Sequence, residues 1–219
     1  GYDGRVSRLK FLAPFLAALF YLPGRYWAIL VLGVSVLASL EWSRICGFSM
    51  GLAIAYAVLT AFLGALLAVW PESAEARGWL AASGLFWVLV APLWLAGSWQ
   101  PKNPLVLATV GWIILAPTAL ALVVLREAGP LAVLAVLVLI WIADTAAYFS
   151  GRAYGRRKLA PAISPGKTWE GVIGAFAAVT LYGAAVSHFG ALSLWIVPGF
   201  WALTVLSILG DLFASWMKR

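Results

Sequence analysis

Long apolar runs separated by short polar segments dominate this 219-residue chain. Several runs approach the roughly 20 residues that an α-helix needs to cross the hydrocarbon core of a bilayer. Only helices and closed barrels satisfy every backbone group inside a bilayer, so such runs predict transmembrane helices. The pattern therefore predicts an all-α, polytopic integral membrane protein. We expect about eight transmembrane helices, at residues 9–22, 26–45, 52–70, 78–97, 105–125, 130–149, 168–188 and 192–213.

Composition supports this interpretation and limits where chemistry can lie. Hydrophobic residues make up 64% of the chain and charged residues only 11%, which excludes an ordinary soluble domain. The expected spans use most of the sequence, so catalytic groups must lie on helix ends and short loops. We expect residues 1–125 to form N-terminal transmembrane helices. Residues 126–219 would form the catalytic transmembrane helices, with a cytoplasmic loop at 150–167.

The distribution of basic residues predicts the orientation in the membrane. With a cytoplasmic N-terminus, only Arg25, Arg77 and Arg126 of the 15 Lys and Arg residues fall on the outer side. Cytoplasmic loops are normally the ones enriched in Lys and Arg, so both termini are expected to be cytoplasmic. The net charge of +7 is then explained by topology and by attraction to anionic lipid or phosphate, not by nucleic-acid binding. The single cysteine, Cys46, is expected to be a packed thiol.

The segment from Asp144 to Gly174 concentrates the candidate chemistry. Asp144 lies in an apolar span, where a charged side chain costs free energy. Such a residue is therefore a candidate functional residue by default. The alternative is that it forms an ion pair that holds the helices together. Five basic residues follow and together indicate an anion site at the membrane surface, although each alone could simply fix topology. They are Arg152, Arg156, Arg157, Lys158 and Lys167.

Helical spacing places more polar groups near the carboxylates. Asp144, Tyr148 and Gly151 are at i, i+4 and i+7, so they share one helical stripe. A second stripe with the same spacing starts at Asp211, and both stripes end on the predicted cytoplasmic side. The next helix begins there too, where its free N–H groups favour an anion. The second stripe comprises Asp211, Ser215 and Lys218, and the helix start carries Ser164, Lys167, Thr168 and Glu170.

Two other patterns are weaker. Gly166–Thr168 spells Gly-Lys-Thr as in a nucleotide P-loop, but Pro161 occupies the position of the required first glycine and no strand precedes it. Thr168 is also a good helix cap and Pro165 a good helix-start residue. His188, the only histidine, has no carboxylate or cysteine nearby.

Without a protein nucleophile and base, the remaining groups suit phosphoryl or nucleotidyl transfer, in which a substrate phosphate attacks and Mg²⁺ neutralises charge.

The segments ADTAAYFSGRAYGRRKLAPAISPGKTWEG (Ala143–Gly171) and GDLFASWMKR (Gly210–Arg219) resemble the C-terminal half of phosphatidate cytidylyltransferases, also called CDP-diacylglycerol synthases. Over the first 125 residues the likeness is one of hydropathy only. The resemblance implies that CTP and phosphatidate give CDP-diacylglycerol and pyrophosphate, with Mg²⁺ or another divalent cation, in the bacterial inner membrane. The phosphate of phosphatidate would be the nucleophile. CTP, phosphatidate and membrane lipids are the implied partners; a homodimer is left open.

The family motifs are carried over position by position. Ser-x-x-Lys-Arg matches Ser215, Lys218 and Arg219, and Ser-Pro-x-Lys-Thr-x-Glu-Gly matches residues 164–171. The metal ligands implied within this chain are Asp144 and Asp211. The catalytic set is Asp144, Lys167, Asp211, Ser215, Lys218 and Arg219. The substrate-binding set is Tyr148, Arg156, Arg157, Lys158, Ser164, Thr168 and Glu170.

The sequence departs from the family pattern after Arg219. The family continues into a Lys-Asp pair, a His-Gly-Gly element and an Asp-Arg-x-Asp element, which this chain lacks. We therefore expect further metal ligands beyond Arg219, and a chain that is C-terminally incomplete and inactive as printed.

Two other functions stay open. A CTP-dependent polyprenol or lipid kinase needs a similar basic site above an apolar pocket, and product identity would distinguish it. A transporter for an anion could use Asp144 for proton coupling, but it predicts inverted repeats and a site at the membrane midplane. The polar cluster lies instead towards one surface, and no convincing repeat is present.

Overall fold

The computed structural model describes residues 14–218 and confirms an all-α, multi-pass architecture. Among these residues seven helical segments are long and apolar enough to cross a membrane. The remaining expected span, at 9–22, is the first along the chain. It is helical over residues 14–21, and residues 9–13 lie outside the described part, so the count of eight is not confirmed. The seven segments are α2 (Gly24–Ile45), α3 (Met50–Val69), Ala74–Ala96, α6 (Pro104–Glu127), α7 (Pro130–Tyr154), α8 (Trp169–Phe189) and α9 (Ile196–Met217).

The chain forms two compact units. The first unit is made of two pieces, the chain up to Gly84 and Gln100–Val133. The second unit is made of Leu85–Trp99 and the chain from Leu134 onward. The boundary near Gly84 coincides with a change in helix type inside the third segment. That segment consists of α4 (Ala74–Leu85), one turn of π-helix η1 (Phe86–Val90), and α5 (Ala91–Ala96). Residues 85–99 thus join the unit that holds the C-terminal helices, although they precede residue 126 in sequence.

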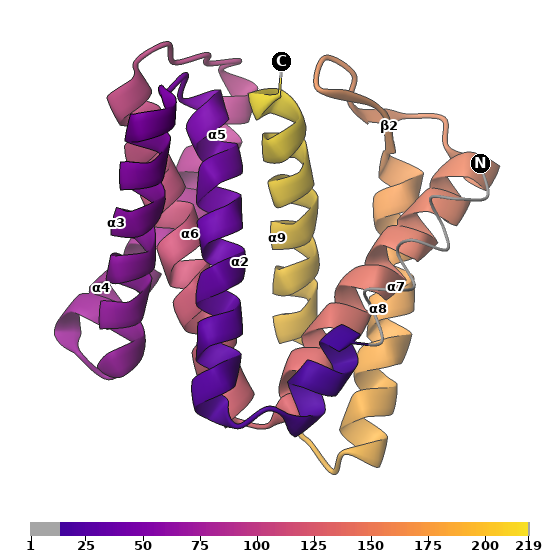
Figure 1. Cartoon of the computed structure of the whole chain (residues 1–219). Coiled ribbons are helices and arrows are strands. Elements are labelled where there is room, and N and C mark those ends of the chain that lie inside the picture. Colours follow the sequence, from indigo (N-terminus) through magenta and orange to yellow (C-terminus); the bar gives the residue numbers. More distant parts are fainter. Residues whose placement is uncertain (1–13, 219) are drawn as a thin grey trace. The chain divides into compact units, whose positions relative to one another are not determined.

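In the first unit, polar side chains of α2 and α3 hydrogen-bond to the backbone of α6. The indole N–H of Trp42 donates to the Leu107 carbonyl at 2.8 Å, and the Tyr56 hydroxyl donates to the Ala108 carbonyl at 3.0 Å. These helices are drawn in indigo to magenta in Figure 1. Inside a bilayer no water replaces such bonds, so they help to fix which helix faces meet.

In the second unit, α5 and η1 hold the C-terminal part of α9. The Phe213 ring meets Phe86 and Trp94 edge-on, each with ring centroids 5.5 Å apart. The Trp216 indole N–H donates to the Trp99 carbonyl at 2.8 Å. The part of α9 that carries Asp211 is therefore anchored on the side away from α8 by an aromatic cluster.

Helices α7 and α8 cross closely because small residues lie between them. A methyl group built on Gly171 would lie 2.8 Å from the Ala147 carbonyl oxygen, and one on Gly174 would collide with the Ser150 side chain. Below this crossing, Leu139 and Ala143 of α7 pack with Ala175 and Val179 of α8 in a buried cluster. Small residues at helix interfaces allow such close backbone approach in membranes.

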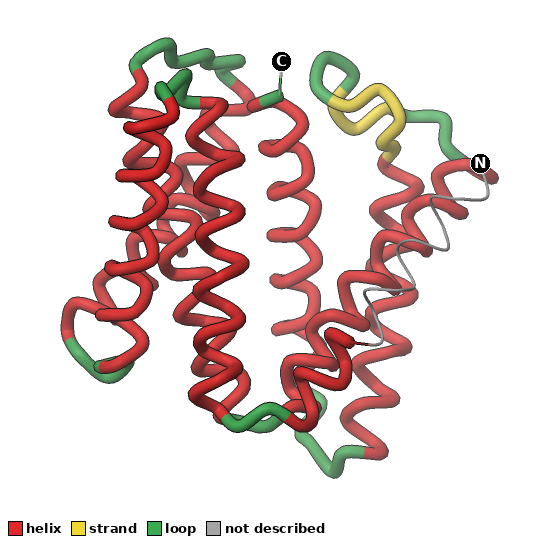
Figure 2. Tube along the Cα trace, in the orientation of Figure 1, coloured by secondary structure: helices red, strands yellow, loops and turns green. Residues whose placement is uncertain are grey.

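The expected loop at 150–167 is more ordered than the sequence indicated. Helix α7 continues to Tyr154, and the segment that follows forms an antiparallel hairpin of β1 (Lys158–Ala160) and β2 (Ser164–Thr168). Figure 2 shows this hairpin in yellow, at the start of α8. The expectation that Ser164, Pro165 and Lys167 lie at the helix start was therefore wrong, because all three lie in β2. A two-stranded sheet has only edge strands, which tolerate a proline because one side of each strand needs no N–H donor.

The close crossing of α7 and α8 generates the first prediction. Gly171→Ala should destabilise the protein by about 1–3 kcal/mol, because the methyl group meets a backbone oxygen that can yield only if the helices separate. Gly199→Ala on α9 is the matched control, since nothing lies within 4 Å of its added methyl group. Thermal unfolding in detergent should show a lower midpoint for the first variant alone. Equal midpoints would mean that the crossing is not tightly packed.

Candidate functional site

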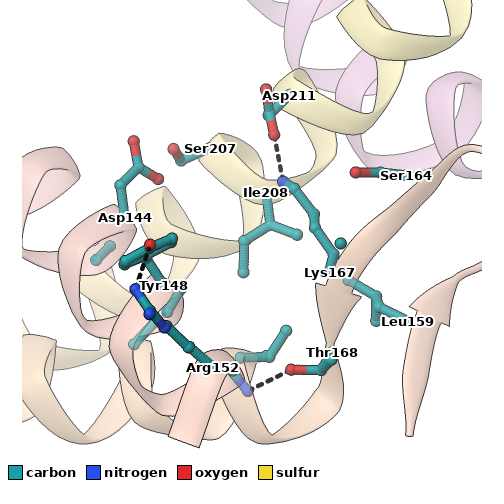
Figure 3. Close-up of a pocket in the computed structure, with 17 residues that line it drawn as sticks. Asp144, Tyr148, Arg152, Leu159, Ser164, Lys167, Thr168, Ser207, Ile208 and Asp211 are labelled. Carbon is teal, nitrogen blue, oxygen red and sulfur yellow. Dashed lines mark hydrogen bonds and ion pairs between the residues drawn. The ribbon is translucent and has the colours of Figure 1, made fainter. Parts of the chain in front are cut away.

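A cavity of about 490 Å³ lies in the second unit, between α7, the hairpin, α8 and α9. Its apolar lining is made by small and branched residues such as Ala143, Val172 and Ile208. The volume falls within the usual range for small-molecule sites. Figure 3 shows its polar side chains converging from three elements. They are Asp144, Tyr148 and Arg152 of α7, Ser164, Lys167 and Thr168 of β2, and Ser207 and Asp211 of α9.

The stripe expected on α7 is confirmed. Asp144, Tyr148 and Gly151 all line the cavity, as their helical spacing requires. Gly151 is needed for packing: a methyl group there would lie 2.9 Å from Thr168 Oγ1. The glycine thus lets the hairpin approach α7 closely enough to close one wall of the cavity.

Thr168 joins the hairpin to α8 and is confirmed as a helix cap. It is buried, and its Oγ1 accepts a hydrogen bond from the Gly171 N–H at 3.2 Å. A threonine at this position satisfies one of the free N–H groups of the first turn. The cap fixes the direction in which β2 enters the helix, and with it the position of Lys167.

Lys167 reaches across the cavity from β2 to α9. Its Nζ lies 2.5 Å from Asp211 Oδ2, with Lys167 26% and Asp211 62% exposed (Figure 3). A pair this accessible stabilises the fold only slightly, because solvent screens it. Asp144 lines the same cavity, but no Lys or Arg among residues 14–218 forms an ion pair with it. The helix-holding ion pair considered for Asp144 is therefore not seen in the described structure.

Several expected site residues lie elsewhere. Ser215 of α9 and Lys218, which caps the C-terminal end of that helix, follow Asp211 but do not line the cavity, and Arg219 lies outside the described residues. Arg156 and Glu170 line a second, more open hollow at the end of α7.

Two further residues that were expected to bind substrate, Arg157 and Lys158, lie at the base of the hairpin. The Arg157 backbone N–H donates to both carboxylate oxygens of Glu170, at 3.2 and 3.3 Å. Lys158 is exposed and pairs in register with Thr168. In this arrangement the Glu170 carboxylate holds the hairpin to the first turn of α8.

Two polar residues of the cavity, Ser207 and Arg152, were not in the predicted catalytic or substrate-binding sets. Ser207 precedes Asp211 by four residues, so extending the α9 stripe towards the N-terminus would have found it. Arg152 was included among the basic residues of the anion site but not among the substrate-binding ones. It follows Tyr148 by four residues and donates to the Tyr148 hydroxyl at 3.2 Å. Extending both stripes by one turn would have identified these side chains.

Asp144 and Asp211 are the carboxylates of this cavity. In the described part of the chain no group of three or more His, Cys, Asp or Glu is arranged to hold a metal ion. Mg²⁺ prefers six oxygen ligands and commonly takes only one or two from protein carboxylates, with substrate phosphates and water supplying the rest. The two side chains therefore fit a shared site of that kind but not a metal cage made by protein alone.

The fold and the cavity define a multi-pass membrane protein whose site combines carboxylates, cations and hydroxyls from α7, α9 and the hairpin. The sequence pattern of the cytidylyltransferase family matches residues 4–219, so the chain belongs to that family of nucleotidyl-transferring enzymes.

Relatives in several bacteria are named phosphatidate cytidylyltransferase. The protein of Pseudomonas aeruginosa is 37% identical, over 98% of this chain and 82% of its own length. That of Haemophilus influenzae is 31% identical, over 98% of this chain and 84% of its own length. The N-terminal half is thus similar to relatives in sequence, which extends the likeness beyond the two C-terminal segments. No solved structure matches the chain with statistical significance.

The Thr168 cap generates the second prediction. Thr168→Val preserves shape but removes the acceptor for the Gly171 N–H, and should lower the free energy of unfolding by about 1 kcal/mol. Thr168→Ser retains the acceptor and should stay close to wild type. Thermal unfolding of both variants in the same detergent is the measurement. A serine variant as unstable as the valine variant would assign the effect to the lost methyl group instead of the cap.

Proposed function

We propose that this protein transfers the cytidylyl group of CTP to phosphatidate, giving CDP-diacylglycerol and pyrophosphate. The observation that carries the proposal is the cavity that brings Asp144 and Asp211 of two membrane-spanning helices together with Lys167 of the hairpin. Membership of the cytidylyltransferase family and the names of the relatives support the same reaction. Both substrates carry phosphate, and one of them is held in the bilayer, so a cavity with cations and carboxylates between membrane-spanning helices suits the pair.

The chemistry needs no covalent protein intermediate. A phosphate oxygen of phosphatidate attacks the α-phosphorus of CTP, a new P–O bond forms, and the bond between the α-phosphorus and the bridging oxygen breaks. Pyrophosphate leaves with that oxygen and its electron pair. The chain then has to hold two anions together in line and to stabilise the charge on the leaving group.

The residues of the cavity can divide this work. Lys167 is the cation that β2 projects into the cavity, and its ammonium group can bind the triphosphate once the anion competes with Asp211. Asp144 and Asp211 would hold Mg²⁺ or another divalent cation, which supplies charge neutralisation to the phosphates. The hydroxyls of Ser164 and Ser207 line the same space and can donate to phosphate oxygens. Thr168 keeps β2 in position through its cap.

The predicted orientation places this chemistry on the cytoplasmic side, where CTP is available. In the second unit, the C-terminal end of α7, the hairpin and the α9 carboxylate meet at one cavity. The positive-inside distribution supports assignment of that end and of both termini to the cytoplasm, in the bacterial inner membrane.

Removal of the Asp144 charge provides the third prediction. In the full-length protein, Asp144→Asn should reduce CDP-diacylglycerol synthesis by about two orders of magnitude, a typical loss for a preorganised electrostatic group. Glu75→Gln, an exposed carboxylate of α4, is the control and should retain full activity. The assay uses purified protein, CTP, phosphatidate and Mg²⁺, and identifies products by mass. CDP-lipid with pyrophosphate supports the proposal, whereas a phosphorylated lipid with CDP would indicate a kinase.

The orientation provides the fourth prediction. Ala162→Cys in the hairpin should stay protected from an impermeant thiol reagent in intact cells, whereas Glu75→Cys should react. Both positions are exposed. Cys46 contributes little background because it is buried, and burial raises the pKa of its thiol to about 11. Labelling of Ala162→Cys with protection of Glu75→Cys would reverse the assigned orientation.

A further inference from the structure

Arg152 is the cation of the cavity that the reaction described above leaves unused. It lines the cavity from the last turn of α7, and its Nη1 donates to the Tyr148 hydroxyl at 3.2 Å. Lys167, in contrast, is paired with Asp211. Within residues 14–218, no carboxylate forms an ion pair with Arg152. A guanidinium group that faces a cavity without a counter-ion is suited to a ligand that brings its own negative charge.

We propose that Arg152, oriented by Tyr148, binds the phosphate of the lipid substrate, whereas the Lys167 and carboxylate side of the cavity receives the nucleotide. This inference rests on the proposed function. The shared chemistry is a phosphate anion, and the lipid is favoured over the nucleotide as its source for two reasons.

The first reason is depth along α7. Arg152 is two residues from Tyr154, where the helix ends, and the end of a spanning helix lies near the level of the lipid headgroups. Asp144 lies ten residues before the same end, about 15 Å along the helix axis. A phosphate attached to a bilayer lipid therefore meets Arg152 without leaving the headgroup level.

The second reason is access from the bilayer. Tyr148 is 59% exposed and its neighbour Phe149 is 62% exposed, on a helix that spans the membrane. The wall of the cavity formed by this part of α7 thus adjoins an exposed aromatic surface that suits contact with acyl chains and headgroups. Lys167 is only 26% exposed and lies on the hairpin.

The arrangement also suits the reaction geometry. Side chains of a helix lean towards its N-terminus, so the Arg152 side chain leans towards Tyr148 and Asp144, as the hydrogen bond to Tyr148 shows. Tyr148 follows Asp144 by four residues, about 6 Å along the axis. Arg152 itself follows Asp144 by eight residues, about 12 Å, so a lipid phosphate held by Arg152 would lie about one to two helical turns from the carboxylate proposed to help hold the metal of the nucleotide. The planar fork of arginine can bind two oxygens of a phosphate at once.

The test separates the two substrates. The full-length protein is assayed for KM of phosphatidate and of CTP, and binding of dioctanoyl phosphatidate or CTP is measured by titration calorimetry in detergent. Arg152→Gln should raise the KM and Kd of phosphatidate on the order of tenfold to hundredfold, because a charge-assisted contact is lost, and leave the KM of CTP within about twofold. Arg152→Lys keeps the charge but loses the fork, so its effect should be smaller. Lys102→Gln removes an exposed charge from a loop of the first unit and should change neither constant.

Tyr148 has its own readout as a positioning residue. Tyr148→Phe should raise the KM of phosphatidate about threefold to tenfold in the wild-type background, and should have no further effect when Arg152 is already glutamine. An independent effect in both backgrounds would show that the hydroxyl does not act through Arg152.

Two results would overturn the inference, and a third would separate it from the proposed reaction. A larger change in the CTP constants than in the phosphatidate constants would assign Arg152 to the nucleotide and overturn the inference. Unchanged constants in well-folded Arg152→Gln and Arg152→Lys would leave Arg152 as a solvated surface charge, which also overturns it. If wild-type protein binds dioctanoyl phosphatidate through Arg152 but forms no CDP-diacylglycerol, the proposed reaction fails while the lipid-phosphate site stands.

Discussion

The close crossing of α7 and α8 determines whether the second unit has a site at all. Gly171 and Gly174 allow the backbones to approach, and Gly151 makes room for Thr168 on the other side of the contact. This approach places Asp144 and Tyr148 of α7 opposite Lys167 of β2 across one cavity. A larger side chain at any of these glycines would separate the wall that carries the carboxylate from the hairpin that carries the lysine. Association of helices in a bilayer relies on such packing because lipid is as apolar as the helices themselves.

The third wall of the cavity is positioned by different means. Helix α9 presents Ser207 and Asp211 to the cavity, and on the other side its Phe213 and Trp216 are held by aromatic rings of η1 and α5 and by the Trp99 carbonyl. The π-helical turn η1 lies where the third span passes from the first unit into the second. π-Helical turns occur often near functional sites. Here the turn contains Phe86, whose ring packs against Phe213 and helps to orient α9, the helix that carries Asp211.

Placing an ion near lipid costs free energy, and this cost bears on which charges of the cavity are paired. Lys167 and Asp211 compensate each other at 2.5 Å, whereas Asp144 and Arg152 have no ionic partner among the described residues. A cation and a carboxylate left unpaired in one cavity suit substrates that arrive as phosphates with a divalent metal ion. The same feature explains why hydroxyls such as Ser164 and Ser207 gather there, since they can donate to phosphate oxygens without adding charge.

Local sequence patterns were sufficient to predict most of the spans and one wall of the cavity. Apolar run length determined the spans because a bilayer imposes it, and helical spacing correctly placed Asp144, Tyr148 and Gly151 on one face. The pairing of Lys167 with Asp211, 44 residues apart, was decided by tertiary structure, as was the exclusion of Ser215 and Lys218 from the cavity. The hairpin at 158–168 was also missed, because a short segment rich in Pro, Gly and Lys has no strand periodicity and its pairing depends on the ends of α7 and α8. Sequence determined which residues carry charge at which depth; only the packing of the helices decided which of those charges meet, because contact across helices depends on rotation and crossing distance that no single helix encodes.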